Sequence, residues 1–128
     1  MIASSTANES RDWARKPLAF MLWWGLPILG GISSSFLGLS LASAAFLWAG
    51  AFAWMGTGCV LNARRCARRH CFISGPALLL GAIAAALVGF GIVSAPHALE
   101  DIVNATVISV ALSCLPEWFS GRYYTLRS

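Results

Sequence analysis

Uncharged stretches divide the chain. No Asp, Glu, Lys or Arg occurs in residues 17–63, 70–99 or 102–116. A helix needs about 20 apolar residues to cross a hydrocarbon core of about 30 Å, and the first stretch is long enough for two such helices. The segment GGISSS, residues 30–35, contains turn-forming residues and divides that stretch. The pattern therefore predicts four membrane spans, at residues 17–33, 36–59, 75–93 and 102–116.

Small residues and prolines refine these spans. Gly, Ala and Ser recur through residues 36–59, and in lipid small residues let helix backbones approach closely. We therefore expect the second span to lie inside the bundle. Pro27 is expected to bend the first span, and Pro76 to stand at the start of the third. The predicted fold is an all-α integral membrane protein, a compact four-helix bundle over residues 17–119 between polar tails at 1–16 and 120–128.

Composition and charge support this class and set the orientation. The chain is 58% hydrophobic and 11% charged, whereas soluble domains are about 45–50% apolar and about 25% charged. The net charge of +4 is a topology signal rather than a sign of nucleic acid, because basic residues are retained on the cytoplasmic side. An even number of membrane crossings between successive basic groups would put all of these groups, and both termini, in the cytoplasm. The protein would then be a multi-pass protein of a bacterial inner membrane. The basic groups are Arg11, Arg15 and Lys16, then Arg64, Arg65, Arg68 and Arg69, then Arg122 and Arg127.

The stretch LNARRCARRHCFISGP, residues 61–76, is the predicted cytoplasmic loop between the second and third spans. Its four arginines are explained by orientation and by contact with anionic headgroups, each charge being worth about 1 kcal/mol. A functional role is the alternative for Arg65 and Arg68, which flank Cys66. They would stabilise a thiolate or pair with Glu117.

Topology does not require the cysteines and the histidine of this region. In a helix that continues the second span, Cys59, Cys66 and His70 would lie along one face. Cys114 falls at the same membrane boundary. Thiolates and imidazole suit soft ions such as copper(I), mercury(II) or zinc(II). The candidate metal ligands are Cys66, His70, Cys71, Cys59 and Cys114.

Two short segments carry a resemblance. NARRCARRHCFISGP and the later CLPEWFSGRYY resemble a group of small, largely uncharacterised bacterial inner-membrane proteins. Those proteins combine an Arg-Cys-x-Arg-x-His-Cys loop and a Gly-Pro helix start with a late Cys-x-Pro-Glu, and the likeness covers residues 36–124. A looser resemblance is to the mercuric-ion transport proteins of mercury-resistance systems. Those carry a cysteine pair in the first span, and this chain has none there.

The sequence favours a membrane protein that binds or transports a thiophilic metal ion at its cytoplasmic face. The alternative is a non-catalytic accessory or assembly subunit of a larger membrane complex, or a homo-oligomer. No phosphate-binding loop, nucleophile elbow or HExxH motif occurs. We therefore expect no enzymatic activity and no nucleic-acid partner. The sequence leaves the cofactor open, with a transiently bound soft metal ion as the candidate.

Overall fold

The structure, a computed structural model, describes residues 9–121, and within that part four helices are long and apolar enough to cross a membrane. Residues 1–8 and 122–128, with Arg122 and Arg127, lie outside the described residues. The elements, in chain order, are the short 3-10 helix Trp13–Arg15, α2 (Pro17–Phe20), a π-helical turn (Met21–Gly25), α3 (Leu26–Phe36), α4 (Leu41–Cys66), α5 (Arg69–Gly89), α6 (Ala98–Ser113) and α7 (Leu115–Ser120).

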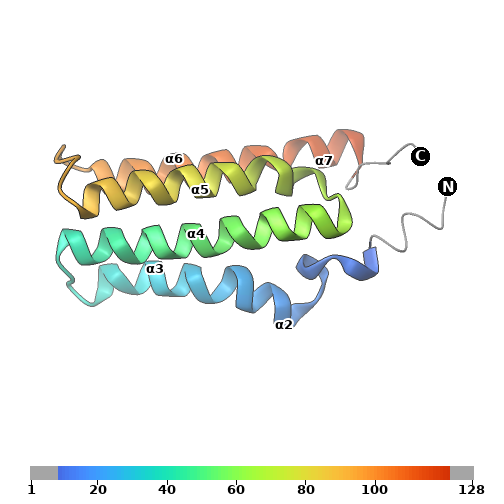
Figure 1. Ribbon diagram of the computed structural model, residues 1–128, viewed down its shortest axis with the longest axis horizontal. Helices are drawn as coiled ribbons and strands as arrows, with labels where there is room; N and C mark the ends of the chain where they lie inside the picture. The colour runs from blue at the N-terminus through green and yellow to red at the C-terminus, as the bar shows by residue number, and fades with distance from the viewer. Residues whose placement is uncertain (1–8, 122–128) are drawn as a thin grey trace.

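The four spans lie side by side in chain order. Helices α4 and α5 form the closely packed centre, α3 packs on α4, and α6 packs on α5 (Figure 1). The turn between α4 and α5 lies at the same end of the bundle as α2 and α7. Segments far apart in sequence therefore meet at this end of the bundle, which we call the polar end.

Glycines permit the close contact of the central helices, as the small-residue pattern predicts. A Cβ atom on Gly75 of α5 would lie 2.8 Å from Val60 Cγ2 of α4. One on Gly81 would lie 2.5 Å from Thr106 Oγ1 of α6. Backbones that approach this closely gain van der Waals contact in lipid. The close contact at Gly75 brings together the turns of α4 and α5 that carry Cys59 and Cys71.

The first span is irregular near Pro27. The π-helical turn Met21–Gly25 directly precedes α3, and proline has no N–H with which to continue the regular hydrogen-bond ladder. Trp23, in this turn, stacks on Trp13 at 5.3 Å and on Trp54 of α4 at 5.2 Å between ring centroids. The aromatic stack joins the first span and the segment before it to α4.

The first predicted turn is misplaced. Residues 30–35 are helical, and the chain turns at residues 37–40, where Gly38 has a φ of +59°. The hydroxyls of Ser33 and Ser34 donate to the carbonyls of Leu29 and Gly31. Serine satisfies its hydroxyl on the helix backbone in this way, so GGISSS remains helical in an apolar span.

The predicted central loop, between residues 59 and 75, is far shorter in the structure. Helix α4 continues to Cys66 and α5 begins at Arg69, with only Ala67 and Arg68 between them. Ala67 makes the reversal in the left-handed region, at φ 54°. Pro76 accordingly lies inside α5 rather than at its start. The third span also ends earlier than predicted, at Gly89.

The fourth span is longer than the predicted 102–116. It covers Ala98–Phe119, with a slight break between α6 and α7. Glu100 and Asp101 lie in the first turn of α6, where carboxylates are stabilised by the helix dipole. Glu117 pairs with Arg68 and hydrogen-bonds to His70. Charges at both ends are therefore accommodated, and they do not limit the helix.

Candidate functional site

Residues 9–16, before the first span, are folded onto the bundle, which corrects the predicted polar tail for this part of residues 1–16. Asp12 is fully buried. Its Oδ1 accepts hydrogen bonds from Ala14 N and from Asn62 Nδ2, both at 2.9 Å. The backbone N–H of Trp13 in turn donates to Asn62 Oδ1 at 2.9 Å. Asn62 of α4 thus satisfies both its donor and its acceptor on this segment, which it fixes in place.

Arg68, in the turn between α4 and α5, joins two carboxylates. Its guanidinium donates to Asp12 Oδ2 at 2.7 Å and, through Nε, to Glu117 Oε1 at 3.4 Å. Burial lowers the pKa of Arg68, but the two carboxylates outweigh burial and raise this pKa above its ordinary value. Arg68 therefore stays charged and ties the N-terminal segment, the central turn and α7 together.

Glu117 of α7 holds the first turn of α5. Its Oε1 lies 2.6 Å from His70 Nδ1 and accepts a hydrogen bond from the His70 backbone N–H at 3.3 Å. A carboxylate at a helix N-terminus satisfies an otherwise unpaired N–H and the helix dipole. With the ionised carboxylate accepting from Nδ1, the neutral imidazole carries its proton there. The lone pair of Nε2 is then available on the other side of the ring.

The thiol of Cys71 lies on that side. Its Sγ is 3.4 Å from His70 Nε2, and Cys71 lies in the same buried cluster as Cys59 of α4. The Cys59 sulfur also accepts from Trp24 Nε1 at 3.3 Å and from Ser74 Oγ at 3.6 Å. Both cysteines are buried. Glu117, His70, Cys71 and Cys59 therefore form one connected series, which we call the thiol relay.

The thiols of the remaining predicted ligands, Cys66 and Cys114, bond to backbone carbonyls instead of joining the thiol relay. Cys66 is buried, but its thiol donates to the Asn62 carbonyl at 3.0 Å. Cys114 is exposed and its thiol donates to the Val110 carbonyl at 3.6 Å. His70 belongs to α5, so the predicted single helical face with Cys59 and Cys66 is wrong, because α4 ends at Cys66. Within residues 9–121, no three His, Cys, Asp or Glu side chains form a group that could hold a metal ion.

The two arginines that flank Cys66 have different surroundings. Arg68 pairs with Glu117, one of the two functional alternatives the sequence offered. Arg65 instead places its guanidinium 4.6 Å from the centroid of the Trp13 ring, a cation–π contact. The arginines therefore secure the N-terminal segment in two ways, by ion pairing and by stacking.

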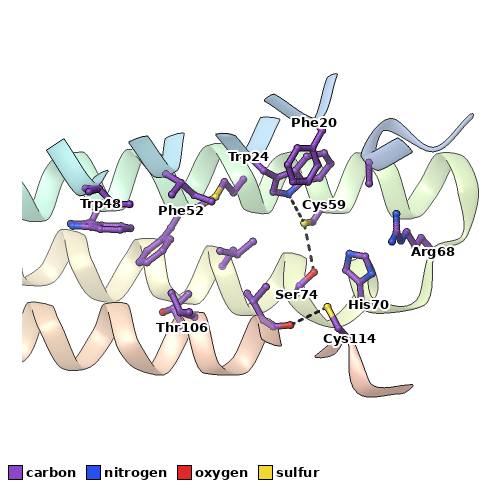
Figure 2. A pocket seen from close by; sticks show the side chains of 17 residues that line it. Phe20, Trp24, Trp48, Phe52, Cys59, Arg68, His70, Ser74, Thr106 and Cys114 are labelled. Atoms are coloured by element: carbon purple, nitrogen blue, oxygen red, sulfur yellow. Dashed lines mark hydrogen bonds between the residues drawn. The ribbon is translucent and has the colours of Figure 1, made fainter. Parts of the chain in front are cut away.

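A cavity of about 500 Å³ begins at the thiol relay and continues between the helices (Figure 2). Cys59 and His70 line its polar end, together with Cys114. The rest of its wall is mainly apolar and comes from all four spans, including Trp24, Phe52, Leu78 and Val110. Its size and lining are those of small-molecule sites, which span about 300–1,000 Å³.

Sequence reasoning missed three residues of the site, Asp12, Asn62 and Ser74. Asn62 carried a signal, since an amide inside an apolar span is costly unless it is paired. Asp12 precedes Trp13 and Ala14 in a helix-capping pattern. Its partner on α4 is 50 positions away, and no local pattern shows that contact.

Comparisons with known proteins find no match to this chain among family models, curated proteins or solved structures. The resemblances drawn from the central stretch and from CLPEWFSGRYY stay predictions.

Proposed function

We propose that this protein binds a soft metal ion through the thiols of Cys59 and Cys71 and conveys it at the polar end of the bundle. The observation that carries the proposal is the thiol relay, in which a carboxylate, an imidazole and two buried thiols of one cluster follow one another. We propose that the polar end faces the cytoplasm of a bacterial cell. The arginines of the turn between α4 and α5 lie at this end, and basic residues are retained on the cytoplasmic side during insertion.

Metal binding requires thiolates, so each thiol must lose its proton. His70 Nε2 lies 3.4 Å from the Cys71 sulfur and accepts that proton. Glu117 then stabilises the imidazolium through the 2.6 Å contact to Nδ1. A carboxylate behind a histidine is a common outer support of metal sites. When a monovalent ion binds, one thiol proton moves to His70 and the other is released to water at the polar end. The bound ion and the imidazolium then balance the charge of the two thiolates.

The number of nearby ligands selects the class of ion. Zinc(II) in structural sites takes four ligands in a tetrahedron, whereas two thiolates suffice for copper(I), silver(I) or mercury(II). The proposed ligand pair is Cys59 and Cys71, with His70 as the proton acceptor. Cys66 and Cys114 are assigned no ligand role. We therefore propose a two-coordinate soft ion as cargo rather than zinc.

The test uses a chain that carries Cys66→Ser and Cys114→Ser, so that only the proposed thiol pair remains. This protein, purified in detergent, is expected to bind one silver(I) ion per chain, measured by elemental analysis after desalting. A further Cys59→Ser or Cys71→Ser change should abolish binding. Equal silver content with and without Cys59 would overturn the proposal.

Matched histidine variants test the role of the thiol relay. His70→Ala should weaken silver binding by about 10–100-fold, the usual effect of removing an outer partner of a metal site. His97→Ala is the control, because His97 lies in an exposed pair with Glu100. Equal affinities of the two variants would show that His70 plays no part in ligand deprotonation.

A further inference from the structure

The apolar cavity has no role in holding a bare ion. A hydrated ion loses its water shell among apolar walls, and the cavity offers no charge to replace that shell along most of its length. The cavity nevertheless leads to the Cys59 thiol. A ligand that uses both features has an apolar body and one thiophilic atom.

The cavity is placed for entry from the bilayer. Helices α4 and α5 form the centre of the bundle, with α3 and α6 on the outside. Residues of both outer helices line the cavity. Ile28 and Ile32 of α3 and Val107 of α6 line the cavity and are also exposed on the surface of the bundle. That surface would face lipid. A neutral, lipid-soluble molecule can therefore reach the polar end without crossing water.

The hydrogen bonds in the cavity wall narrow the range of possible ligands further. Every buried side-chain nitrogen and oxygen in residues 9–121 already has a hydrogen-bond partner. Ser74 Oγ donates to Cys59, and Thr106 Oγ1 donates to the Ile102 carbonyl at 2.7 Å. A quinone or a lipid ester needs donors for its carbonyl oxygens. The cavity therefore favours a ligand whose affinity comes from thiol bonding and apolar contact.

We propose that the cavity and the Cys59–Cys71 thiol pair together bind a neutral organic compound of trivalent arsenic, with one apolar substituent on arsenic. Such an atom needs two thiolates, since its organic group occupies the third position. The thiol pair supplies those two, and the organic group lies in the cavity next to Cys59. This inference rests on the thiol pair of the proposed function and adds the class of ligand.

The binding step balances without an external reagent. An arsenic(III) oxide of the form R–As=O reacts with the two thiols to give R–As(S–Cys)₂ and water. Two arsenic–sulfur bonds form, while two S–H bonds and the arsenic–oxygen bond break. Both thiol protons leave with the oxygen as water, and no atom changes oxidation state. No net charge is created inside the bundle.

The test uses phenylarsine oxide as probe, on the chain with Cys66→Ser and Cys114→Ser. Native mass spectrometry should show one phenylarsenic adduct per chain, and Cys59→Ser should remove it. Inorganic arsenite, which favours three thiolates, should bind at least about tenfold more weakly, because it has no ring to bury against the apolar cavity wall. Equal affinity for arsenite would overturn the inference.

A variant that fills the cavity tests the place of the organic group. Val110→Phe puts a ring into the cavity wall, and Ile108→Phe adds the same ring on the exposed face of α6, away from the cavity. Val110→Phe should weaken phenylarsine oxide binding at least about tenfold. Silver binding should stay unchanged in both variants. Equal phenylarsine oxide affinity in the two variants would contradict the inference.

Silver binding separates the two proposals. If silver binds and phenylarsine oxide does not, the arsenical inference fails and the proposed function stands. If neither binds, both fail. Should Val110→Phe lose silver binding through misfolding, Val107→Phe at the exposed edge of the cavity takes its place, with the same expected loss of phenylarsine oxide affinity.

Discussion

Each end of the bundle carries a histidine paired with a glutamate, and the two pairs differ in their surroundings. At the polar end, His70 and Glu117 approach to 2.6 Å, with side chains 16% and 11% exposed. At the opposite end, His97 and Glu100 approach to 3.3 Å, with side chains 74% and 76% exposed. The same two residue types thus form a partly buried, supported pair in one place and a solvated pair in the other.

The difference arises from what surrounds each pair. Glu117 also meets Arg68, which continues to Asp12, while His70 continues to Cys71. The exposed pair spans one turn of α6, between His97 at the helix cap and Glu100. Burial strengthens an electrostatic contact and raises the cost of breaking it. A functional assignment therefore follows from the network, since the residue pair by itself occurs at both ends.

The largest effect is expected from Arg68→Leu, which removes the cation facing two buried carboxylates. Breaking a buried ion pair by removing one partner costs about 3–5 kcal/mol. We expect the free energy of unfolding in mixed micelles to fall by about that amount. Arg64→Leu is the matched control, since Arg64 is exposed, and should change it by less than about 0.5 kcal/mol. Equal losses would show that the polar end is no more than a charged surface.

Four helices long and apolar enough to cross a membrane could be predicted from the sequence, because charge is excluded from a hydrocarbon core. Their limits could not, since Glu117 is paired with Arg68 and hydrogen-bonded to His70, and a gap in charge therefore does not mark the helix end. The turn predicted at residues 30–35 is helical instead, because the hydroxyls of Ser33 and Ser34 bond to the helix backbone.

Several residues of the candidate site could be singled out from the sequence, but the contacts between them could not be predicted. Cys59, His70 and Cys71 were singled out because soft ligands are unneeded for topology. Their contact depends on the close approach of α4 and α5 at Gly75 and on the short turn at Ala67. Asp12 pairs with Arg68 across 56 positions. Such contacts are set by tertiary packing, which periodicity and spacing do not encode.

A smaller effect is expected from Arg68→Lys, which keeps the charge and removes the planar fork. One ammonium cannot reproduce the separate contacts from the guanidinium to Asp12 and Glu117. We expect a loss of about 1–3 kcal/mol in the free energy of unfolding, because one hydrogen bond to a buried carboxylate is lost. Membrane insertion should be unchanged, since the topology rule counts positive charge.

The matched control for that substitution is Arg64→Lys, measured for unfolding in micelles and for the amount of protein in the membrane. Both arginine variants should insert equally well, and only Arg68→Lys should be less stable. If Arg68→Lys is as stable as the wild type, orientation alone explains all the arginines of the central turn.

The smallest effect is expected at the exposed pair. Glu100→Gln removes the carboxylate that meets His97, and exposed ion pairs contribute about 0–1 kcal/mol. Glu100 also lies in the first turn of α6, where a carboxylate gains a few tenths of a kcal/mol from the helix dipole at most sites. We expect the unfolding free energy to change by less than about 1 kcal/mol, with that small change reduced by added salt. Glu117→Gln, measured beside it, should cost more and respond less to salt, because its partners Arg68 and His70 are largely shielded from water. If the two substitutions lower the unfolding free energy equally and respond equally to salt, burial does not distinguish the two ends of the bundle. The network at the polar end would then be no argument for a functional site there.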